Sequence, residues 1–458
     1  MKARLLSDIA RMAGGRLQGQ DRTVDAIATD TRALPQGGAA LFVALKGERF
    51  DGHDHVARAA QAGVAAALVS REVVDADIPQ IVVADTERAL ADFAAAVHRE
   101  RAQTVVAITG SNGKTSVKSL TQSILQQVGP TYATPGNRNN EIGLPLAVID
   151  APEGVRFAIY EMGAGKPGDI AYLTAIARPD VSVVNNIAPG HLERMGSLLG
   201  VADTKAAIYD ALPPEGVAVI NADDAFAPYF AERAHGRRLV RFGLDASADI
   251  TARDIEALDE GSRFVLVAPQ GEGSIQLALP GRHNVSNALA AAALALNAGA
   301  PLRAVIDGLN AARPVAGRLI AHRLDNGAVL IDDSYNANPG SLAAAIDTLA
   351  AAPGEAWLVL GDMRELGVDA QAMHAEAGRR AKGAGIRRLF TLGPHSAAAT
   401  QAFGEGATHF ETHAALADVL RTELHDGVRV LVKGSRGSAM DKIVAALVGA
   451  QEGGTHAA

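Results

Sequence analysis

The chain has 458 residues, which corresponds to about three domains of ordinary size. Hydrophobic residues make up 48% of the chain and charged residues 21%, so sizeable apolar cores can form. The net charge of -8 argues against a nucleic-acid partner, and the absence of cysteine excludes disulfides and thiolate metal sites.

No apolar run is long enough to cross a bilayer, because Val64–Val69 and Ala288–Leu296 are short and rich in alanine. The first residues contain no long apolar segment either, so we expect no signal peptide. Together with the lack of cysteine, this predicts a cytoplasmic protein without integral membrane association.

The first 100 residues are predicted to form a small α/β domain. Apolar runs indicate strands at Ala40–Leu45, Val64–Val69 and Gln80–Ala84, with a helix near His53–Ala62. Thr31 and Arg32 lie in a polar turn before them. An arginine beside hydroxyl groups can hold a diphosphate, although solvated loops explain such residues about equally often.

A glycine-rich turn follows the predicted buried strand Thr104–Thr109 and opens a helix with apolar residues at helical spacing. Its sequence is Gly110-Ser111-Asn112-Gly113-Lys114-Thr115-Ser116. Glycines let the backbone approach a phosphate, the free N–H groups of the first helical turn bind it, and Lys114 adds a cation. The hydroxyl of Thr115 can bind Mg²⁺. We interpret this turn as a nucleotide triphosphate loop, the alternative being an ordinary glycine-rich turn with a surface lysine.

Residues 101–312 alternate predicted strands and helices, a pattern typical of a parallel sheet with crossover helices. Glu161 ends the predicted strand at Phe157–Tyr160, and His191 follows the strand at Val181–Val184. Since ligands gather beyond the carboxyl ends of parallel strands, these two side chains and Thr115 are candidates to share Mg²⁺. A lone loop histidine is, however, more often plain surface.

Two later segments of this stretch are ambiguous. Lys205 lies in a predicted helix at Val201–Tyr209, where spacing alone favours a solvated lysine. The polar stretch Pro280–Asn287 opens a long alanine-rich helix. Its amide side chains can read a base edge, or Asn284 or Ser286 can simply cap the helix.

Residues 313–318 read as a linker with proline and glycine, and a third domain of dinucleotide-fold type follows over 313–458. Strands are predicted at Ala328–Ile331, Ala356–Leu360, Arg388–Leu392 and Val428–Val432. Polar clusters follow three of them, at Asp332–Pro339, Gly361–Gly367 and Lys433–Arg436. Three such clusters at one sheet edge predict a substrate site.

The phosphate loop T-G-S-N-G-K-T-S resembles that of the Mur ligases, which add amino acids to the peptidoglycan precursor. The resemblance covers almost the whole chain. The motifs D-D-S-Y-N-A-N-P, G-D-M-x-E-L-G and K-G-S-R are similar to those of the family member that adds D-alanyl-D-alanine. One departure is Gly437, where the family pattern leads us to expect a bulkier residue.

The resemblance implies a three-domain α/β fold: a small N-terminal α/β domain, a central P-loop ATPase-like parallel sheet, and a Rossmann-like C-terminal domain. The first (1–100) would hold the UDP end of UDP-N-acetylmuramoyl tripeptide, the second (101–312) ATP, and the third (313–458) D-Ala-D-Ala. The implied reaction is ATP-dependent ligation through an acyl phosphate with two Mg²⁺ ions, by a monomer.

The resemblance also implies roles for individual residues. The nucleotide would contact Gly110, Ser111, Asn112, Gly113, Lys114, Thr115, Ser116, Asn284, Asn287, Arg318 and Asp333. Mg²⁺ would be held by Thr115, Glu161, His191 and Lys205, the last as a carbamate formed with CO₂. The peptide substrates would contact Thr31, Arg32, Asn137, Asn140, Asn336, Asn338, Lys433 and Arg436. Lys114, His191 and Lys205 are the implied catalytic residues.

Two other functions stay open on the sequence. A folylpolyglutamate synthetase shares the phosphate loop and the ligase chemistry, although the third-domain motifs argue against it. An NTP-driven switch or kinase would make no amide bond. Phosphate release separates them, since a ligase should hydrolyse little ATP until both substrates are present.

Overall fold

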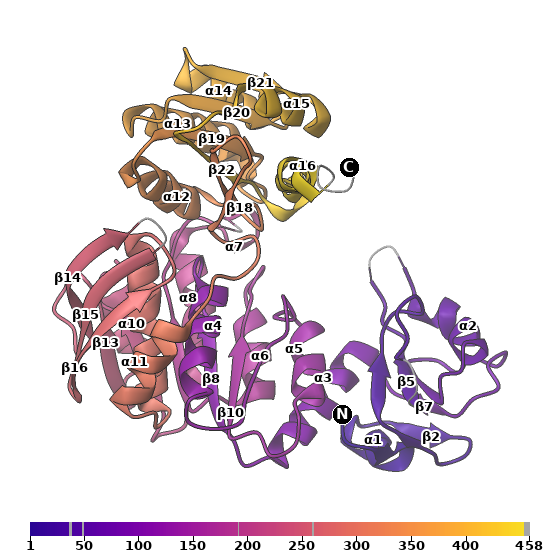
Figure 1. The fold of residues 1–458 in the computed structure, drawn as a ribbon. Helices are drawn as coiled ribbons and strands as arrows, with labels where there is room; N and C mark the ends of the chain where they lie inside the picture. Colours follow the sequence, from indigo (N-terminus) through magenta and orange to yellow (C-terminus); the bar gives the residue numbers. More distant parts are fainter. Residues whose placement is uncertain (36–38, 48–49, 191, 259–260, 453–458) are drawn as a thin grey trace.

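The structure is a computed structural model that describes residues 1–35, 39–47, 50–190, 192–258 and 261–452, with side chains to residue 449. Three mainly parallel sheets with their own helices follow one another along the chain (Figure 1). The predicted three-domain α/β fold is therefore confirmed. The predicted boundaries at 100/101 and 312/313 fall between regular elements and remain proposals.

The N-terminal sheet has five strands in the order β2-β7-β6-β5-β4, parallel except for β2, and β1 and β3 form a separate antiparallel pair. Three strands and a helix lie where the sequence predicts them. The elements are β1 (Arg4–Leu5), α1 (Leu6–Met12), β2 (Arg16–Gln18), β3 (Thr23–Val24), β4 (Ala26–Ala28), β5 (Ala40–Val43), η1 (Gly52–His55), α2 (Val56–Gln61), β6 (Ala66–Val69), β7 (Gln80–Val82) and α3 (Thr86–Arg99).

The middle sheet has six parallel strands in the order β13-β12-β11-β8-β10-β9. Its central strand β8 sends Val105 and Ala107 to one apolar layer and Val106 and Ile108 to the other, so both faces are buried. The elements are β8 (Thr104–Thr109), α4 (Lys114–Leu125), β9 (Thr131–Ala133), α5 (Gly143–Asp150), β10 (Phe157–Glu161), α6 (Asp169–Ala177), β11 (Val181–Val184), α7 (Leu192–Met195), α8 (Leu198–Asp210), β12 (Val217–Asn221), α9 (Ala227–Arg233) and β13 (Arg238–Phe242).

The expectation of strand–helix alternation throughout 101–312 is wrong for its last third. Three antiparallel strands follow instead, β14 (Thr251–Leu258), β15 (Gly261–Ala268) and β16 (Gly271–Leu277). Phe264 and Leu266 of β15 and Ile275 of β16 are buried in the layer that α4 and α10 also join. The strands thus form an outer wall over α10 (Arg282–Asn297) and α11 (Leu302–Ala311) (Figure 1).

The C-terminal sheet has the order β17-β18-β22-β19-β20-β21 and is parallel except for β17. The four predicted strands are present, and β17 and β21 were not predicted. The elements are β17 (Ile320–Arg323), β18 (Val329–Asp333), α12 (Pro339–Ala351), β19 (Glu355–Gly361), η2 (Gly367–Asp369), α13 (Ala370–Gly383), β20 (Arg388–Leu392), α14 (Ala397–Phe403), β21 (Ala407–Phe410), α15 (His413–Glu423), β22 (Val428–Lys433), η3 (Arg436–Ser438) and α16 (Asp441–Glu452).

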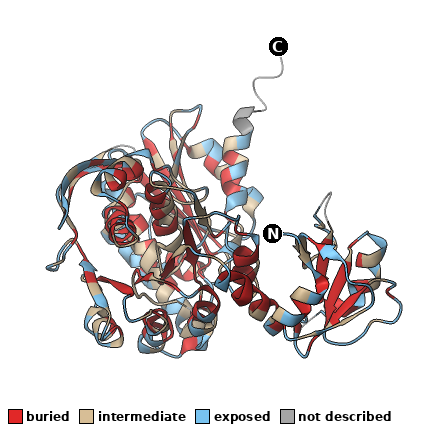
Figure 2. Cartoon of the chain, turned by 90° about the horizontal axis from the view of Figure 1, so that it is seen from below, coloured by how far each residue is buried: buried red, intermediate tan, exposed pale blue. Residues whose placement is uncertain are grey.

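Helix α3 joins the N-terminal and middle domains through one apolar core. Leu90, Phe93 and Val97 of α3 belong to the same buried cluster as Leu41 of the first sheet and Leu144 of α5. Buried residues accordingly fill both domains and the helices where they meet (Figure 2). The two buried clusters of the C-terminal domain, in contrast, consist of residues from 319 onward.

Within the described ranges, no helix is both long enough and apolar enough to span a lipid bilayer.

Candidate active site

The glycine-rich turn between β8 and α4 needs its glycines for two reasons. Gly110 and Gly113 have φ values of 147° and 78°, a backbone region that disfavours side chains. A Cβ on Gly113 would also lie 2.4 Å from Oδ1 of Asn287 and 2.5 Å from Nδ2 of Asn185. The turn is braced further by Asn186, whose side-chain oxygen accepts a hydrogen bond from the Asn112 N–H at 2.8 Å. The glycines and these contacts therefore fix the loop backbone in a conformation that a phosphate can approach closely.

Lys114 is half-buried and its ammonium donates to the Gly110 carbonyl oxygen at 2.8 Å. Burial lowers the pKa of Lys114 below its ordinary value, the Glu161 carboxylate opposes this shift, and Arg318 adds to it. A phosphate at the loop would replace the carbonyl as the partner of this ammonium.

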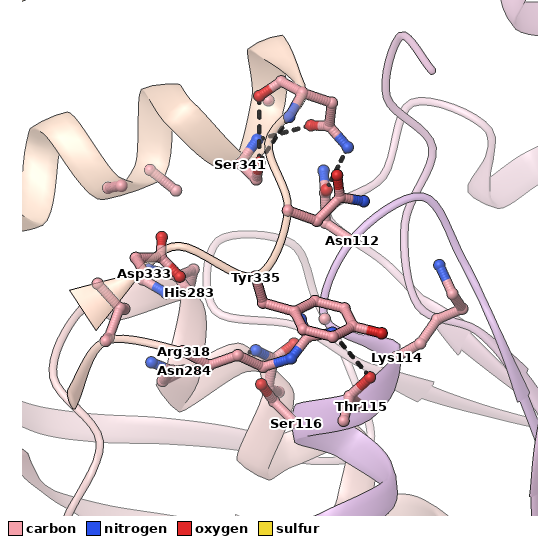
Figure 3. A pocket seen from close by; sticks show the side chains of 18 of the residues that line it. Asn112, Lys114, Thr115, Ser116, His283, Asn284, Arg318, Asp333, Tyr335 and Ser341 are labelled. Carbon is pink, nitrogen blue, oxygen red and sulfur yellow. Dashed lines mark hydrogen bonds between the residues drawn. The ribbon is translucent and has the colours of Figure 1, made fainter. Parts of the chain in front are cut away.

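Two cavities meet at this turn. The first, the Lys433 cavity, measures about 280 Å³ and is lined by Asn112, Thr115, Ser116, Asn284, Asn287, Asp333 and Lys433, among others (Figure 3). The second, the Lys205 cavity, measures about 500 Å³ and is lined by Asn137, Asn140, Glu161, Lys205, Arg364 and Arg436, among others. Lys114 and Arg318 line both cavities, so the phosphate loop lies where the two spaces adjoin.

Glu161 is buried at the end of β10 and is the centre of a polar cluster. Its carboxylate accepts hydrogen bonds from the Thr115 hydroxyl at 3.0 Å and the Asn139 amide at 2.8 Å, and pairs with Lys118 Nζ at 3.1 Å. Burial alone would raise the pKa of Glu161, but the ammonium groups of Lys118 and Lys114 outweigh it and hold the pKa below its ordinary value. Glu161 is therefore a carboxylate.

Thr115 and Glu161 supply the hard oxygen donors that Mg²⁺ prefers, and this chemistry fits the ion. Arg318 also reaches this point, since its guanidinium donates to the Thr115 hydroxyl at 2.9 Å. His191, the third predicted ligand, lies outside the described residues. In the parts of the chain that the structure describes, no group of three or more His, Cys, Asp or Glu side chains gathers in a metal-binding arrangement.

Lys205 of α8 is only 3% exposed, so the solvated-lysine interpretation is wrong. The prediction from spacing failed because Lys205 lies at the wall of a cavity and not on the solvated surface. Burial lowers the pKa of Lys205 to about 7, Lys114 contributes in the same direction, and Asp169 opposes both. A buried lysine at the wall of a cavity, with a pKa near neutrality, has an amine that can react.

Asn284 and Asn287 are both buried at the start of α10. Asn287 donates to Asn284 at 3.1 Å and accepts from Asn185 at 2.9 Å, while Asn284 donates to the Pro280 carbonyl at 2.8 Å. Neither Asn284 nor Ser286 caps the helix, because Gly281 stands at its N-cap without a side-chain hydrogen bond. The capping alternative is therefore wrong.

The ends of β18 and β22 carry a buried ion pair between Asp333 and Lys433 at 2.6 Å. Lys433 also donates to the Asn336 carbonyl at 2.9 Å. Burial raises the pKa of Asp333, and Lys433 opposes the shift. Lys433 and Asp333 line the first cavity, whereas Arg436 lines the second, so the two predicted substrate-binding residues Lys433 and Arg436 lie in different cavities.

Asn338 caps helix α12 and also touches the phosphate loop. Its side-chain oxygen accepts from the Ser341 N–H at 2.9 Å, and its amide donates to Oδ1 of Asn112 at 2.7 Å (Figure 3). Arg318 lies over the Tyr335 ring at 4.6 Å. The C-terminal domain therefore reaches the loop through polar groups.

The remaining predicted substrate residues lie in two places. Asn137, Asn140, Asn336 and Asn338 line the Lys205 cavity. Thr31 and Arg32 lie in the N-terminal domain, line neither cavity, and the guanidinium of Arg32 pairs with Asp30 at 2.6 Å. They are thus separate from the phosphate loop.

Three family models match consecutive parts of the chain. The model described as "Mur ligase family, catalytic domain" matches residues 23–98, "Mur ligase middle domain" matches 108–295, and "Mur ligase, glutamate ligase domain" matches 317–436. The UDP-N-acetylmuramoyl-tripeptide--D-alanyl-D-alanine ligase of Escherichia coli (strain K12) is 45% identical over 98% of this chain and 99% of its own length. The chain belongs to the Mur ligase family.

Other Mur ligases agree with this assignment. The protein of the same name from Mycobacterium tuberculosis is 37% identical over 97% of each chain. A crystal structure of MurF from Acinetobacter baumannii superposes with a TM-score of 0.92 at 34% identity, covering 98% of this chain and 99% of that one. MurF from Thermotoga maritima in complex with ADP superposes with a TM-score of 0.83 at 27% identity, covering 94% and 98%.

Lys118 and Asn139 are two residues of this Mur ligase site that the sequence analysis missed. Lys118 is buried and donates to the carbonyls of Thr134 and Gly136 as well as pairing with Glu161. It follows Lys114 by four residues and so lies on the same helix face, which was the available signal. No comparable local pattern marks Asn139.

Proposed function

We propose that this chain is an ATP-dependent, ADP-forming ligase that joins D-alanyl-D-alanine to UDP-N-acetylmuramoyl tripeptide, making the pentapeptide precursor of peptidoglycan. Relatives bearing that name match nearly the whole chain. The observation that carries the proposal is that Lys114 lines both cavities, because a ligase must bring a phosphate and an acceptor carboxylate together at one point.

The reaction requires activation of a carboxylate, whose own leaving group would be oxide. Transfer of the terminal phosphoryl group of ATP to the tripeptide carboxylate gives an acyl phosphate and ADP. The amine of D-Ala-D-Ala then attacks the acyl carbon, and the tetrahedral intermediate expels phosphate. In this scheme Lys114 balances the charge of the transferred phosphoryl group.

The two cavities suggest how the substrates divide. The nucleotide would occupy the Lys433 cavity, with its base towards Asn284 and Asn287 and with Arg318 and Asp333 contributed from beyond the linker. The tripeptide terminus and the dipeptide would meet in the Lys205 cavity, near Asn137, Asn140 and Arg436. The UDP end would extend towards Thr31 and Arg32 in the N-terminal domain.

Mg²⁺ would be held by Thr115 and Glu161, together with His191 and a modified Lys205. When bound, the ion would neutralise phosphate charge during transfer. Lys118 and Asn139 would keep the Glu161 carboxylate in position for it.

We further propose that Lys205 carries a carbamate. A neutral amine is required for reaction with CO₂, and burial beside Lys114 favours the neutral form. The nitrogen attacks CO₂ and releases a proton, which replaces a cation by an anion able to bind a second Mg²⁺. The modified lysine would then act as an acidic residue.

Product formation tests the ligase proposal. ADP release should be slow with ATP alone or with one peptide substrate, and should become rapid when UDP-N-acetylmuramoyl tripeptide and D-Ala-D-Ala are both present. Mass spectrometry should then find the pentapeptide. Separate reactions with the diaminopimelate- and lysine-containing tripeptides identify the accepted third residue. Rapid ADP release without any peptide product would support an NTPase or kinase, and glutamate addition to a folate would support the folylpolyglutamate synthetase alternative.

Carbon-13 NMR tests the carbamate. With ¹³C-bicarbonate at pH 8, above the Lys205 pKa of about 7, the wild type should show a carbamate signal that Lys205→Ala lacks. Both the signal and activity should fall as the pH drops below 7, because the amine becomes an ammonium. Lys205→Ala should lose most activity, and small carboxylates should restore part of it. A wild type without the signal at pH 8 contradicts the modification.

We also propose that the reaction takes place in the cytoplasm and that the enzyme acts as a monomer. The lack of cysteine is compatible with a reducing compartment. The Lys433 and Lys205 cavities are lined by residues of a single chain, which supports a complete site in the monomer.

A further inference from the structure

Gly437 stands where the family resemblance leads us to expect a bulkier residue, and the structure shows what fills the space beside it. A Cβ on Gly437 would lie 2.5 Å from both Cζ and Nη1 of Arg364 and 2.8 Å from its Nε. The space that a side chain would fill is therefore occupied by a guanidinium group. The backbone of Gly437 lies outside the left-handed region, so glycine leaves room here for the guanidinium and is not needed for its conformation.

Arg364 is fixed at this place by two hydrogen bonds. Its Nη2 donates to the Gly437 carbonyl at 3.0 Å, and its backbone N–H donates to the Ser435 hydroxyl at 2.9 Å. Ser435 in turn donates to the Ala337 carbonyl at 3.1 Å. One serine hydroxyl thus joins the three polar motifs that follow β18, β19 and β22, with the guanidinium at their edge.

The next residue, Glu365, has φ of 63°, an uncommon value for a residue with a side chain. Such strained positions are concentrated in binding and active sites, where the surrounding structure maintains them. Here the turn carries Arg364 out of the end of β19 and over Gly437.

Arg364 is one of the residues that line the Lys205 cavity. Arg364 is exposed, and its guanidinium donates to a backbone carbonyl, that of Gly437. Arg436 lines the same cavity and is only loosely paired, 3.5 Å from Asp441. Among the acids of this cavity, Glu161 pairs with Lys118, and Asp169 accepts two backbone N–H groups.

We propose that Arg364, seated over Gly437, binds a carboxylate group of a peptide substrate in the Lys205 cavity. This inference rests on the ligase function proposed above. A planar guanidinium matches a carboxylate in geometry and charge. The carboxylate belongs either to D-Ala-D-Ala or to the tripeptide, and Arg436 would assist. Lys433 is less suited, because Asp333 and the Asn336 carbonyl already engage its ammonium.

Steady-state kinetics of Arg364→Ala test the contact. The KM of the substrate that carries the carboxylate should rise about tenfold, with a smaller change in kcat. Arg364→Lys should restore little, since a point charge lacks the planar fork. Arg379→Ala is the matched control, because Arg379 is an exposed arginine paired with Glu376 and lines neither cavity.

Modified substrates identify the source of the carboxylate. If it is that of D-Ala-D-Ala, the wild type and Arg364→Ala should have similar KM values for D-alanyl-D-alaninamide, whose terminus is neutral. If it is the extra carboxylate of diaminopimelate, Arg364→Ala should raise the KM of the diaminopimelate tripeptide but not of the lysine tripeptide. A rise for both tripeptides would indicate a carboxylate that they share.

Gly437→Ala tests whether the position of the Arg364 guanidinium over Gly437 matters, without removing its positive charge. The added methyl group must displace the guanidinium, so the same KM should rise in the wild-type background. In the Arg364→Ala background there is nothing left to displace, and Gly437→Ala should change that KM by less than about twofold.

The inference is overturned if Arg364→Ala leaves the KM of the dipeptide and of both tripeptides within about twofold of the wild type. It is equally overturned if Gly437→Ala has the same effect in both backgrounds. A wild type that forms no pentapeptide would instead contradict the ligase function, so the two failures are distinguishable.

Discussion

The two junctions between domains are built in opposite ways. Helix α3 connects the N-terminal and middle domains through a continuous apolar core that includes Leu90, Phe93 and Leu144. The middle and C-terminal domains meet through hydrogen bonds instead, from Arg318 to Thr115 and from Asn338 to Asn112.

This difference has a physical consequence. Separating an apolar junction exposes buried surface to water at about 25 cal/mol per Å². Separating a polar junction exchanges protein hydrogen bonds for bonds to water, at a net cost of about 1 kcal/mol each. The first junction should therefore stay closed throughout the reaction, while the second can open to admit substrates and close over the phosphate loop.

Lys114→Ala should have the largest effect, because this lysine belongs to the phosphate loop at the polar junction and lines both cavities. Ligation should fall by about 10³-fold or more while the fold and both junctions persist. Coupled ADP-release kinetics and circular dichroism measure these two properties. Near-normal turnover in a folded variant would contradict the assignment of the phosphate loop.

Phe93→Ala breaks the apolar junction. Loss of this buried ring should destabilise the protein by about 3–5 kcal/mol, and the N-terminal and middle domains should be affected together. Hydrogen exchange should quicken in β5 and in α5 alike.

Phe403→Ala is the matched control, because Phe403 is equally buried but lies in a C-terminal cluster. Its effect should stay within α13, α14 and β20. If Phe93→Ala quickens exchange on one side of α3 only, the idea of a shared core is wrong.

Asn112→Ala weakens the polar junction without altering a helix cap. The loss of one hydrogen bond should raise the KM of ATP about three- to tenfold and leave the melting temperature unchanged. Asn338→Ser is its counterpart on the other domain, where the shorter hydroxyl can still cap α12 but is too short to reach Asn112. Different effects of the two variants on KM would argue against a single shared contact.

The smallest expected effect is a change in the relative angle of the middle and C-terminal domains. Small-angle scattering of the free protein and of the protein with an ATP analogue and tripeptide should differ, because the domains flanking Gly317 should change their relative angle. A distance between labels in the N-terminal and middle domains should stay constant in the same samples. Identical scattering profiles, with binding confirmed separately, would count against a hinge.

The phosphate loop was predictable because its signal is local. Strand, glycines, lysine and helix follow one another within 22 residues, Thr104 to Leu125, and each has its own backbone requirement. The ends of β10, β18 and β22 were predictable for a related reason, since parallel strands deliver their following residues to one edge. The fold class and the polar clusters could therefore be derived from the sequence.

The three antiparallel strands were missed although local signals exist. Apolar and polar residues partly alternate along β15 and β16, and Pro269 and Gln270 form a turn between them. Extending the strand–helix pattern of the preceding residues obscured this period of two. The two-residue period within these segments predicts strands correctly, whereas the strand–helix pattern of the preceding residues does not.

The burial of two lysines could not be derived from the sequence. Lys118 and Lys205 each lie in a predicted helix, and whether such a residue is solvated depends on elements distant in the chain. We expected a bulkier residue at Gly437, and the structure places the guanidinium of Arg364, 73 residues earlier, against it. Nothing in the sequence between them specifies that contact.

The apolar junction at α3 also fixes a distance within the protein. Because the N-terminal and middle domains share one core, the distance between Thr31 and Lys114 should stay the same throughout the reaction. If the UDP end of the precursor binds near Thr31, as proposed above, its terminal carboxylate must reach Lys114 across this fixed distance. One residue fewer in the peptide would leave the carboxylate short of the phosphate loop by up to about 3.5 Å. The enzyme would then select its acceptor by reach as well as by the chemical groups it touches.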